Sequence, residues 1–362
     1  MKICHMTSVH QSTDIRVFIK ECCSLADAGY DVYLVAKGDS RNENNVEVIG
    51  VGNMPTGKLK RMFTFSKTVY KKALTLDCDV YHFHDPELLP YGIKLAKKGK
   101  TVIFDSHEDV PAQILDKSYI PAPLRKLISN IYKCYETHAV KYFSAVIAAT
   151  PHIAKQFKGR AKKIVVINNY PKLDDIEFHT TPFDKREAIV CYAGGINELR
   201  GEKIMVEAMR NVDGTLIIAG EHELVKLESK NGDKGVVDYV GKLDRNGVNK
   251  LYGKAVVGLC LLKPAKNYIN SQPIKMYEYM AAGIPFICSD FPKWKLIADK
   301  TQAGICVDPE NNSAVVTAIN LLLENRSISQ EMGIRGRKAV EQFYSWEAES
   351  KVLLGLYHKL EG

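Results

Sequence analysis

Short apolar runs alternate with amphipathic stretches along the whole chain. In its first half these runs predict strands, at residues 2–8, 31–38, 46–52, 79–85, 101–108, 145–150 and 163–169. They lack a regular alternation of polar and apolar positions, which is typical of parallel strands covered on both faces. Between the first two runs a helical period predicts one apolar face, made of Ile15, Phe18, Ile19, Cys22, Leu25 and Ala26. Gly29 is a suitable stop for that helix, and the pattern as a whole predicts an α/β fold.

A polar segment with prolines, residues 171–187, interrupts this pattern and indicates a linker. A second series of predicted strands follows at residues 188–195, 214–221, 236–243, 255–262, 285–291 and 304–309, and a long amphipathic helix is predicted over residues 344–360. We therefore predict two Rossmann-like, doubly wound domains, 1–171 and 172–344, that face an interdomain cleft. Ligands of such sheets bind at the carboxyl ends of the strands, so polar residues at these ends are the candidates for chemistry.

Composition excludes several classes of protein. Hydrophobic residues make up 46% and charged residues 25% of the 362 residues, as in ordinary globular proteins. No apolar run approaches the length of a membrane span, and the start of the chain lacks the pattern of a signal peptide. The nine cysteines include no CxxC pair, so we expect reduced thiols in a cytoplasmic protein.

The positive charge is concentrated in the first half. Residues 1–170 hold 25 Lys and Arg against 16 Asp and Glu, whereas residues 171–362 hold 25 against 26, and the net charge is +8. Part of the excess lies in residues 58–74, where cations mix with large apolar side chains. This segment is either a basic amphipathic helix on an anionic membrane surface or a core helix with a solvated basic face. Nucleic acid is not an expected partner, because no recognition motif is present.

Glycines follow the predicted strands of the second half. Gly194 and Gly195 come after the first strand, and Gly220 and Gly241 come after the next two. Glycine lets the backbone approach a ligand closely. Arg200 stands where the following helix begins, so its guanidinium and the helix N-terminus could bind an anion. Neither a dinucleotide fingerprint nor a P-loop is present, and turn glycines with a solvated arginine are the alternative.

The segment Asn270–Phe286 contains a lysine in an unusual place. Lys275 lies in the first turn of a predicted helix that ends at Gly283, and a cation there opposes the helix dipole. A bound anion would explain this position. Glu278, which lies one turn later, could accept hydrogen bonds from a sugar diol. The alternative is an i,i+3 ion pair of the two side chains on a solvated helix face.

Polar side chains also lie at strand ends in the first half. Two predicted strands end with His84, Asp85, His107 and Glu108. Two such ends on one rim favour a functional site over isolated structural histidines. Before the first helix, Asp14 is a suitable cap, and Arg16 is another cation in a first helical turn. We expect no metal site, because there is no HExxH motif and no spacing brings three ligands together.

Several of these motifs resemble one enzyme family. The stretches "DSHE" at residues 105–108, "GG…RG" at residues 194–201 and "PIKMYEYMAAGIP" at residues 273–285 resemble the retaining GT-B glycosyltransferases often called group 1. The resemblance covers essentially the whole chain, and residues 273–285 are its most specific part. The stretches "HQSTDIRVFIKE" and "HFHDPELL" resemble the first domain of a bacterial branch linked to the synthesis of surface polysaccharides such as capsule.

The resemblance implies a nucleoside diphosphate sugar in the second domain and an acceptor in the first. Glu278 matches the family glutamate that holds the ribose hydroxyls, Arg200 stands where the family has a diphosphate-binding lysine, and His107 matches a histidine near the donor sugar. The acceptor side would include Asp14, Arg16, His84, Asp85 and Glu108. The last helix, 345–362, would cross back to the first domain. No cofactor or metal is implied, because cationic side chains and a helix N-terminus neutralise the leaving diphosphate.

Two positions depart from the family pattern. Asn270 stands eight residues before Glu278, where the family has a glutamate, and an amide cannot carry charge or act as a base. Gly195 stands five residues before Arg200, where the family has an arginine. Lys275 is the obvious substitute for the missing cation. These departures bear on the identity of the donor more than on the class of reaction.

The resemblance therefore implies a retaining transfer of a hexosyl unit from a UDP- or GDP-linked sugar to a saccharide or polyprenyl-linked acceptor. The residues expected to act on the reacting sugar and its leaving group are His107, Asn270, Arg200 and Lys275. The enzyme would work in the cytoplasm or peripherally on the inner face of the cytoplasmic membrane. A sugar-nucleotide epimerase of the same fold and a non-catalytic nucleotide-sugar-binding protein are the alternatives.

Overall fold

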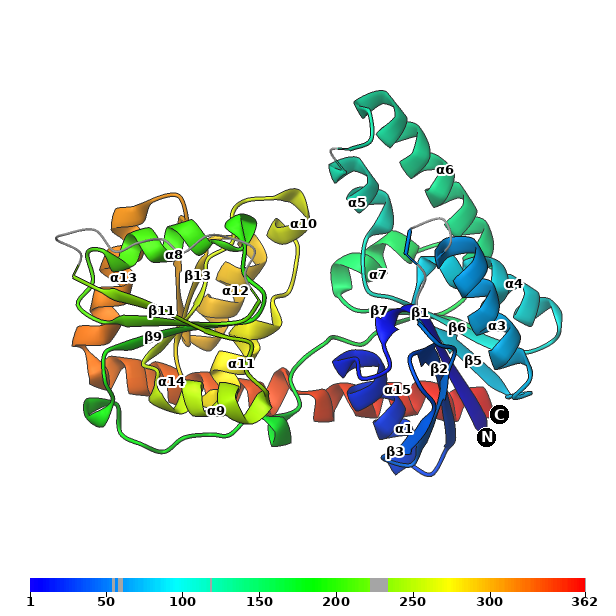
Figure 1. Ribbon diagram of the computed structural model, residues 1–362, viewed down its shortest axis with the longest axis horizontal. Coiled ribbons are helices and arrows are strands. Elements are labelled where there is room, and N and C mark those ends of the chain that lie inside the picture. The colour runs from blue at the N-terminus through cyan, green and yellow to red at the C-terminus, as the bar shows by residue number, and fades with distance from the viewer. Residues whose placement is uncertain (54–55, 58–60, 118, 222–233, 362) are drawn as a thin grey trace. The chain divides into compact units, whose positions relative to one another are not determined.

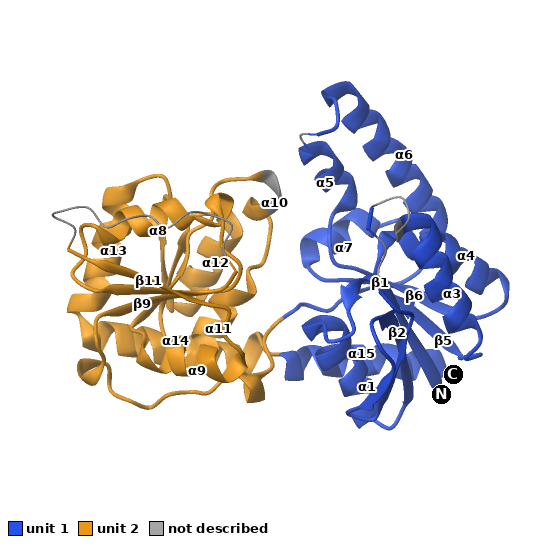
Figure 2. Ribbon diagram, in the orientation of Figure 1, with its two compact units in different colours: residues 1–169, 346–362 blue, residues 170–345 orange. Residues whose placement is uncertain are grey.

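A computed structural model describes residues 1–53, 56–57, 61–117, 119–221 and 234–361. The chain divides into two compact units, which Figure 2 distinguishes by colour. Unit 1 contains residues 1–169 together with residues 346–362, and unit 2 contains residues 170–345. These bounds differ by no more than two residues from the predicted ones.

Unit 1 is built on an eight-stranded sheet with the order β3-β4-β2-β1-β5-β6-β7-β8 (Figure 1). Its strands are β1 (Lys2–Gln11), β2 (Asp31–Lys37), β3 (Arg41–Glu43), β4 (Val46–Gly50), β5 (Val80–Phe83), β6 (Thr101–Ser106), β7 (Ala145–Ala148) and β8 (Ile164–Val166). Every predicted strand is present. The sequence did not predict β3, the one antiparallel strand of the described residues in this sheet, because its three residues are polar. The strand order reverses between β1 and β5, the position where doubly wound sheets bind ligands.

Helices cover both faces of this sheet. They are η1 (Ile15–Cys22), α1 (Cys23–Asp27), η2 (Arg61–Phe65), α3 (Ser66–Leu74), η3 (Pro86–Leu88), α4 (Leu89–Lys97), α5 (Val110–Asp116), α6 (Ala122–Val140), α7 (Pro151–Phe157) and α15 (Trp346–Glu361). One core forms where α3, α4, α6 and α7 pack on the sheet. A second core forms on the opposite face, where η1 and α1 meet the C-terminal helix α15 through Trp346 and Tyr357.

The first helical segment differs from the predicted α-helix. Residues 15–22 form a π-helix, whose i→i+5 hydrogen bonds widen each turn. The wider turn places Arg16, Lys20 and Glu21 on the buried face, whereas Ile15 is 51% exposed. The predicted apolar face is therefore wrong at Ile15. A sequence pattern assessed with the α-helical period cannot reveal that charged residues here point into the protein.

Unit 2 has a six-stranded parallel sheet with the order β11-β10-β9-β12-β13-β14. Its strands are β9 (Ile189–Ala193), β10 (Thr215–Ala219), β11 (Val236–Gly241), β12 (Val257–Cys260), β13 (Phe286–Ser289) and β14 (Gly304–Val307). Its helices are η4 (Leu173–Asp175), η5 (Phe183–Lys185), η6 (Glu198–Arg200), α8 (Glu202–Met209), α9 (Arg245–Lys254), α10 (Lys266–Ile269), α11 (Ile274–Ala282), α12 (Pro292–Thr301), α13 (Asn312–Glu324) and α14 (Arg326–Phe343). The strand order reverses between β9 and β12, which is the Rossmann arrangement.

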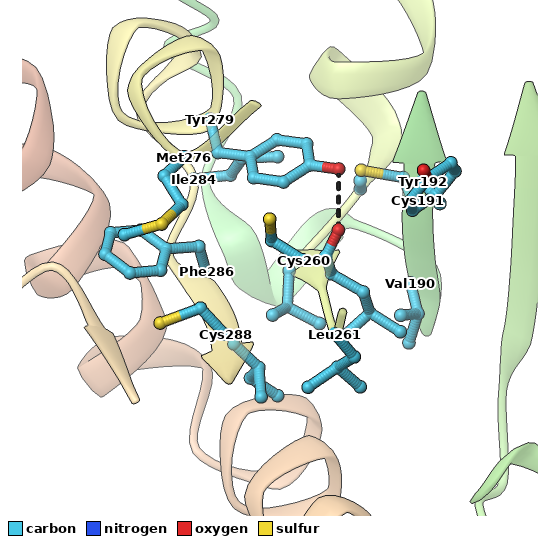
Figure 3. Packing of buried hydrophobic residues seen from close by; sticks show 14 of the residues in the cluster. Val190, Cys191, Tyr192, Cys260, Leu261, Met276, Tyr279, Ile284, Phe286 and Cys288 are labelled. Carbon is cyan, nitrogen blue, oxygen red and sulfur yellow. Dashed lines mark hydrogen bonds between the residues drawn. The ribbon is translucent and has the colours of Figure 1, made fainter. Parts of the chain in front are cut away.

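Helix α11 is fixed tightly onto the sheet of unit 2. The ring of Tyr279 packs where a Cβ would stand on Gly258, and its hydroxyl donates a hydrogen bond of 3.1 Å to the Leu259 carbonyl (Figure 3). The helix ends at Gly283, whose φ of +75° is the left-handed conformation of a helix stop. Pro273 precedes the helix as its cap residue. The sheet thus holds the helix that carries Lys275 and Glu278 in a defined position.

Among the described residues, no helix combines the length and the apolar character that crossing a bilayer requires.

Candidate functional site

The loop after β9 lets a ligand approach its backbone closely. Gly194 and Gly220 have φ values of +130° and +158°, which favour glycine. A Cβ on Gly220 would overlap the carbonyl oxygen of Gly194. The Gly194 N–H donates to the Ala219 carbonyl at 2.7 Å, and the Gly220 N–H donates to the Gly241 carbonyl at 2.8 Å. Three of the four predicted glycines, Gly194, Gly220 and Gly241, therefore lie together at the carboxyl ends of β9, β10 and β11.

Lys275 reaches this loop from the first turn of α11. A Cβ on Gly194 would lie 2.8 Å from Lys275 Nζ, and the ammonium is 4.7 Å from the centre of the Tyr192 ring. Among the described residues, it has no ion-pair or hydrogen-bond partner. Burial, together with the nearby charge of Arg200, lowers the pKa of Lys275. A half-buried ammonium without a counterion, next to glycine backbone, is suited to bind an anion.

Arg200 lies on the other side of the glycine pair. Its Nη1 donates to the Gly195 carbonyl at 2.8 Å, and the Tyr192 hydroxyl donates to the same oxygen at 2.9 Å. A Cβ on Gly195 would lie 2.9 Å from Arg200 Nη1, so glycine makes room for the guanidinium. Gly201 follows with a φ of +82° as the N-cap residue of α8, and a Cβ there would overlap the Leu261 carbonyl oxygen. Arg200 therefore also shapes the loop that would receive an anion.

Glu278 has partners that the sequence did not reveal. Arg245 Nη2 donates to Glu278 Oε1 at 3.1 Å, and the Tyr252 hydroxyl donates to Oε2 at 3.0 Å. Burial alone would lower the pKa of Arg245, but the Glu278 carboxylate outweighs this effect and raises that pKa. The carboxylate is 15% exposed. Its ion pair is with α9 and not with Lys275, so the i,i+3 alternative is wrong. Arg245 and Tyr252 lie seven residues apart on α9, which places both side chains on one face of that helix. This spacing is the feature of the sequence that could have indicated them as partners of Glu278.

Asn270 differs from the other candidates in its surroundings. It is exposed and caps the C-terminal end of α10, and its backbone carbonyl accepts a hydrogen bond of 2.9 Å from Lys293 Nζ. Its backbone is therefore anchored, while its side-chain amide faces solvent. The amide remains a candidate for sugar binding.

In unit 1, a buried carboxylate holds the loop after β1. Asp85 Oδ2 accepts hydrogen bonds from the Thr7 hydroxyl at 2.8 Å and from the Ser8 and Val9 N–H groups at 2.6 and 3.2 Å. Its other oxygen lies 3.6 Å from His10 Nε2. Asp85 thus joins the ends of β1 and β5 at the position where the strand order reverses.

His107 is oriented by a buried ion pair that the sequence analysis missed. Its Nε2 lies 2.7 Å from Asp105 Oδ2. Arg16 binds the same carboxylate through Nε at 3.1 Å and through Nη2 at 3.0 Å. Burial opposes the charge of Asp105, but Arg16 and His107 outweigh it and hold the pKa of Asp105 well below its usual range. The histidine is therefore supported by a fixed negative charge.

Three residues expected on the acceptor side are not available there. Arg16, His84 and Asp85 were expected to face an acceptor, but their side chains are almost completely buried. Arg16 is held by Asp105, and His84 Nδ1 lies 3.3 Å from Asp105 Oδ2. Arg16 and His84 therefore support His107 from behind.

The remaining candidates of unit 1 have defined positions. The Asp14 carboxylate caps η1 by accepting from the Arg16 and Val17 N–H groups, as predicted. Its second oxygen lies 3.1 Å from His10 Nδ1. Glu108 is exposed, and its backbone carbonyl accepts a hydrogen bond from the Ser106 hydroxyl.

The two units match two family models. Residues 174–339 match the model of glycosyl transferases group 1, and residues 16–170 match the model of glycosyltransferase family 4. Among curated proteins, none matches the chain.

Solved structures resemble the chain over nearly its whole length. Sucrose-phosphate synthase from Thermosynechococcus elongatus is 16% identical with a TM-score of 0.75, over 99% of this chain and 98% of that one. HepE from Anabaena, in complex with UDP and glucose, is 13% identical with a TM-score of 0.71, over 99% and 100%. WaaG, a glycosyltransferase involved in lipopolysaccharide biosynthesis, is 12% identical with a TM-score of 0.71, over 97% and 98%. These similarities confirm the predicted GT-B fold.

Proposed function

We propose that this chain, which belongs to the group 1 glycosyltransferases and has their GT-B fold, transfers a hexosyl unit from a nucleoside diphosphate sugar to a saccharide or lipid-linked acceptor. The observation that carries the proposal is the Lys275 ammonium, which lies against Gly194 without a counterion among the described residues. The diphosphate of the donor supplies the missing negative charge.

Unit 2 has the groups that such a donor needs. Lys275, Arg200 and the N–H groups of the glycine loop bind the diphosphate, and Glu278 accepts hydrogen bonds from the ribose hydroxyls. Each Glu278 oxygen already accepts one hydrogen bond, and each has a further lone pair for a ligand. Arg245 and Tyr252 keep the carboxylate in place. UDP is the nucleotide to test first, because HepE was solved in complex with it.

The reaction proceeds with retention at the anomeric carbon. The bond from this carbon to the diphosphate oxygen breaks through an oxocarbenium-like transition state, and the acceptor oxygen attacks on the same face. The leaving phosphate oxygen takes the acceptor proton, so no side chain has to act as a base. Lys275 and Arg200 stabilise the charge that develops on the diphosphate, and no metal or cofactor has a role in this proposal. His107 and Asn270 orient the transferred sugar.

Incubation with UDP- and GDP-linked hexoses tests the function. We expect one of these sugars to raise the melting temperature and to be consumed only when a saccharide or polyprenyl-phosphate acceptor is present. Nuclear magnetic resonance of the product should show the anomeric configuration of the donor. A changed sugar nucleotide without an acceptor would instead establish an epimerase. Binding without transfer or hydrolysis would establish a non-catalytic binding protein.

A surface of unit 1 supports a membrane-bound acceptor. Helices α5 and α6 extend away from the sheet (Figure 2), and one side of α6 exposes Leu124, Leu127 and Ile131 by 48%, 55% and 60%. Lys126 and Lys133 are exposed beside this stripe. Apolar side chains flanked by cations are typical of helices that rest on an anionic bilayer, where each cation contributes about 1 kcal/mol.

The predicted basic segment, residues 58–74, is exposed only in part. Residues 58–60 lie outside the described residues, and η2 and α3 form the remainder. Phe63 is exposed, whereas Phe65 and Val69 are buried in the core of unit 1. The buried side chains fit the core-helix alternative, and a membrane contact through the exposed side chains of this segment is part of the proposal. We place the enzyme on the inner face of the cytoplasmic membrane, in the synthesis of a surface polysaccharide.

Sedimentation with lipid vesicles tests the membrane contact. The protein should sediment with vesicles that contain phosphatidylglycerol, and high salt should weaken the binding because it screens the cations. The double variant Leu127→Gln with Ile131→Gln should bind at least about tenfold more weakly, since two exposed apolar side chains are lost. Ile334→Gln, at an exposed position of unit 2, is the matched control. Equal binding of all three proteins would exclude α6 as the contact.

A further inference from the structure

Three histidines meet inside unit 1, below the rim that carries His107. His5 of β1 pairs in register with His82 of β5, and His84 stands two residues further along the chain, directly after the end of β5. The centre of the His82 ring is 4.4 Å from that of His5 and 4.6 Å from that of His84, and the His5 and His84 centres are 5.2 Å apart. None of the three side chains is accessible to solvent to more than 3%.

A carboxylate from the π-helix η1 completes the group. Glu21 Oε2 lies 3.8 Å from His82 Nε2 and 4.0 Å from His84 Nε2, and its side chain is fully buried. His5 Nδ1 lies 3.0 Å from His84 Nε2. One nitrogen or oxygen from each of the four side chains falls within 4.8 Å of the others. Three imidazoles and one carboxylate thus offer ligand atoms close to one another.

Several buried polar atoms in this group have no hydrogen bond. They are His5 Nε2, His82 Nε2 and both carboxylate oxygens of Glu21. An unsatisfied buried polar atom costs about 1–3 kcal/mol, so four of them in one place would be a large loss for a folded domain. Arg16 Nε lies 3.1 Å from Glu21 Oε1, and this is an ion pair without hydrogen-bond geometry. Something beyond the protein side chains is needed to satisfy Glu21 Oε2 and His82 Nε2.

The outer nitrogens of two histidines are already held. His82 Nδ1 lies 2.8 Å from the Tyr357 hydroxyl of α15, and His84 Nδ1 lies 3.3 Å from Asp105 Oδ2. A histidine that donates its Nδ1–H to such a partner has a lone pair on Nε2, directed at the centre of the group. This arrangement is the usual support of metal-binding histidines, in which a carboxylate or a hydroxyl fixes the tautomer.

We propose that His5, Glu21, His82 and His84 bind one divalent transition-metal ion of the zinc class. Neutral imidazoles with a carboxylate are the ligands that such ions prefer. Two ligand atoms about 2.1 Å from one ion lie about 3.4 Å apart in the tetrahedral coordination of zinc. The 3.0 Å between His5 Nδ1 and His84 Nε2 therefore widens slightly when the ion is bound. The distances from Glu21 Oε2 to the Nε2 atoms of His82 and His84 are longer. They shorten in the metal-bound protein because the ion attracts the carboxylate.

The ion has a structural role in this proposal. It joins η1 to β1 and β5 where the strand order of unit 1 reverses, and it does not touch the reacting sugar. Its positive charge balances Glu21, while Arg16 balances Asp105. Through His84 and Asp105 the ion lies behind His107. The proposal does not depend on sugar transfer, because the site would bind its ion whatever the reaction is.

Elemental analysis tests the proposal directly. The full chain, purified without a polyhistidine tag, should contain about one transition-metal ion per molecule. His138→Ala, which removes an exposed histidine of α6 outside the group, should retain that ion. Glu21→Gln and His82→Ala should each reduce the metal content at least about tenfold. Glu21→Gln keeps the size of the side chain, so circular dichroism can verify that this variant is folded.

Reconstitution with Co²⁺ provides a second measurement. Chelator-treated protein should bind one Co²⁺ with visible absorption bands, Zn²⁺ should displace them, and the metal-free protein should unfold at a lower temperature. A chain that is isolated without metal, and that binds neither Co²⁺ nor Zn²⁺ after chelation, overturns the proposal, and buried water or shared protons then satisfy these atoms. Unchanged metal content in folded Glu21→Gln and His82→Ala overturns it as well.

Discussion

Replacing Lys275 with methionine should reduce the turnover of sugar transfer by about two to three orders of magnitude, the typical effect of losing one group that stabilises developing charge. Methionine has a similar length and can still pack on the Tyr192 ring. The variant therefore removes the charge beside Gly194 without opening a large cavity. Single-turnover kinetics with the donor identified by the nucleotide-sugar screen would measure the effect on the chemical step.

The same variant should raise the melting temperature of the empty protein. Burial lowers the pKa of Lys275, which means that its charge is less favourable in the folded state than in water. Methionine removes that cost, while the affinity for UDP falls. Lys300→Met is the control, because Lys300 lies in the last turn of α12, at the opposite end of unit 2. Near-normal turnover in Lys275→Met would exclude this lysine from the diphosphate site.

Replacing Arg16 with methionine should destabilise unit 1 by about 3–5 kcal/mol, the usual result of removing one partner of a buried ion pair. Arg16 holds Asp105 through two hydrogen bonds and lies 3.1 Å from Glu21. Without the guanidinium, Asp105 would retain only its contacts with His84 and His107, and Glu21 would lose the cation beside it. Denaturant unfolding, followed by a probe in unit 1, would measure the loss.

A surface ion pair of the same unit provides the comparison. Lys100 Nζ lies 2.8 Å from Asp77 Oδ1, but the aspartate is largely exposed, so water screens the pair. Lys100→Met should therefore leave the unfolding transition almost unchanged. If Arg16→Met and Lys100→Met had the same small effect, the buried pair would contribute no more than a surface one.

The sheets of both units could be predicted because their strands are continuous apolar runs. Such runs are distinctive in parallel sheets. The short strand β3 could not be predicted, because its three residues are polar. The π-helix η1 could not be predicted from the α-helical period. Its wider turn directs Arg16 and Glu21 inward, and this geometry depends on the buried partners that the sheet supplies.

The candidate site could be predicted in part. The glycines after β9 to β11 and the unusual position of Lys275 are local features, so the sequence contains them directly. The partners of Glu278 come from α9, and those of His107 come from η1 and β6. Contacts between elements that are distant in the sequence follow from packing. For this reason only the structure could assign Arg245, Tyr252 and Asp105 to the site.

The C-terminal helix gives unit 1 a particular order of assembly. Unit 1 takes its last helix, α15, from residues 346–361, after the whole of unit 2. Trp346 and Tyr357 fill the core beside η1, and the Tyr357 hydroxyl is the partner of His82. During synthesis on the ribosome, unit 2 can therefore complete its fold before unit 1, although it is made later. A chain that stopped between unit 2 and residue 346 would therefore lack a core helix of its N-terminal half.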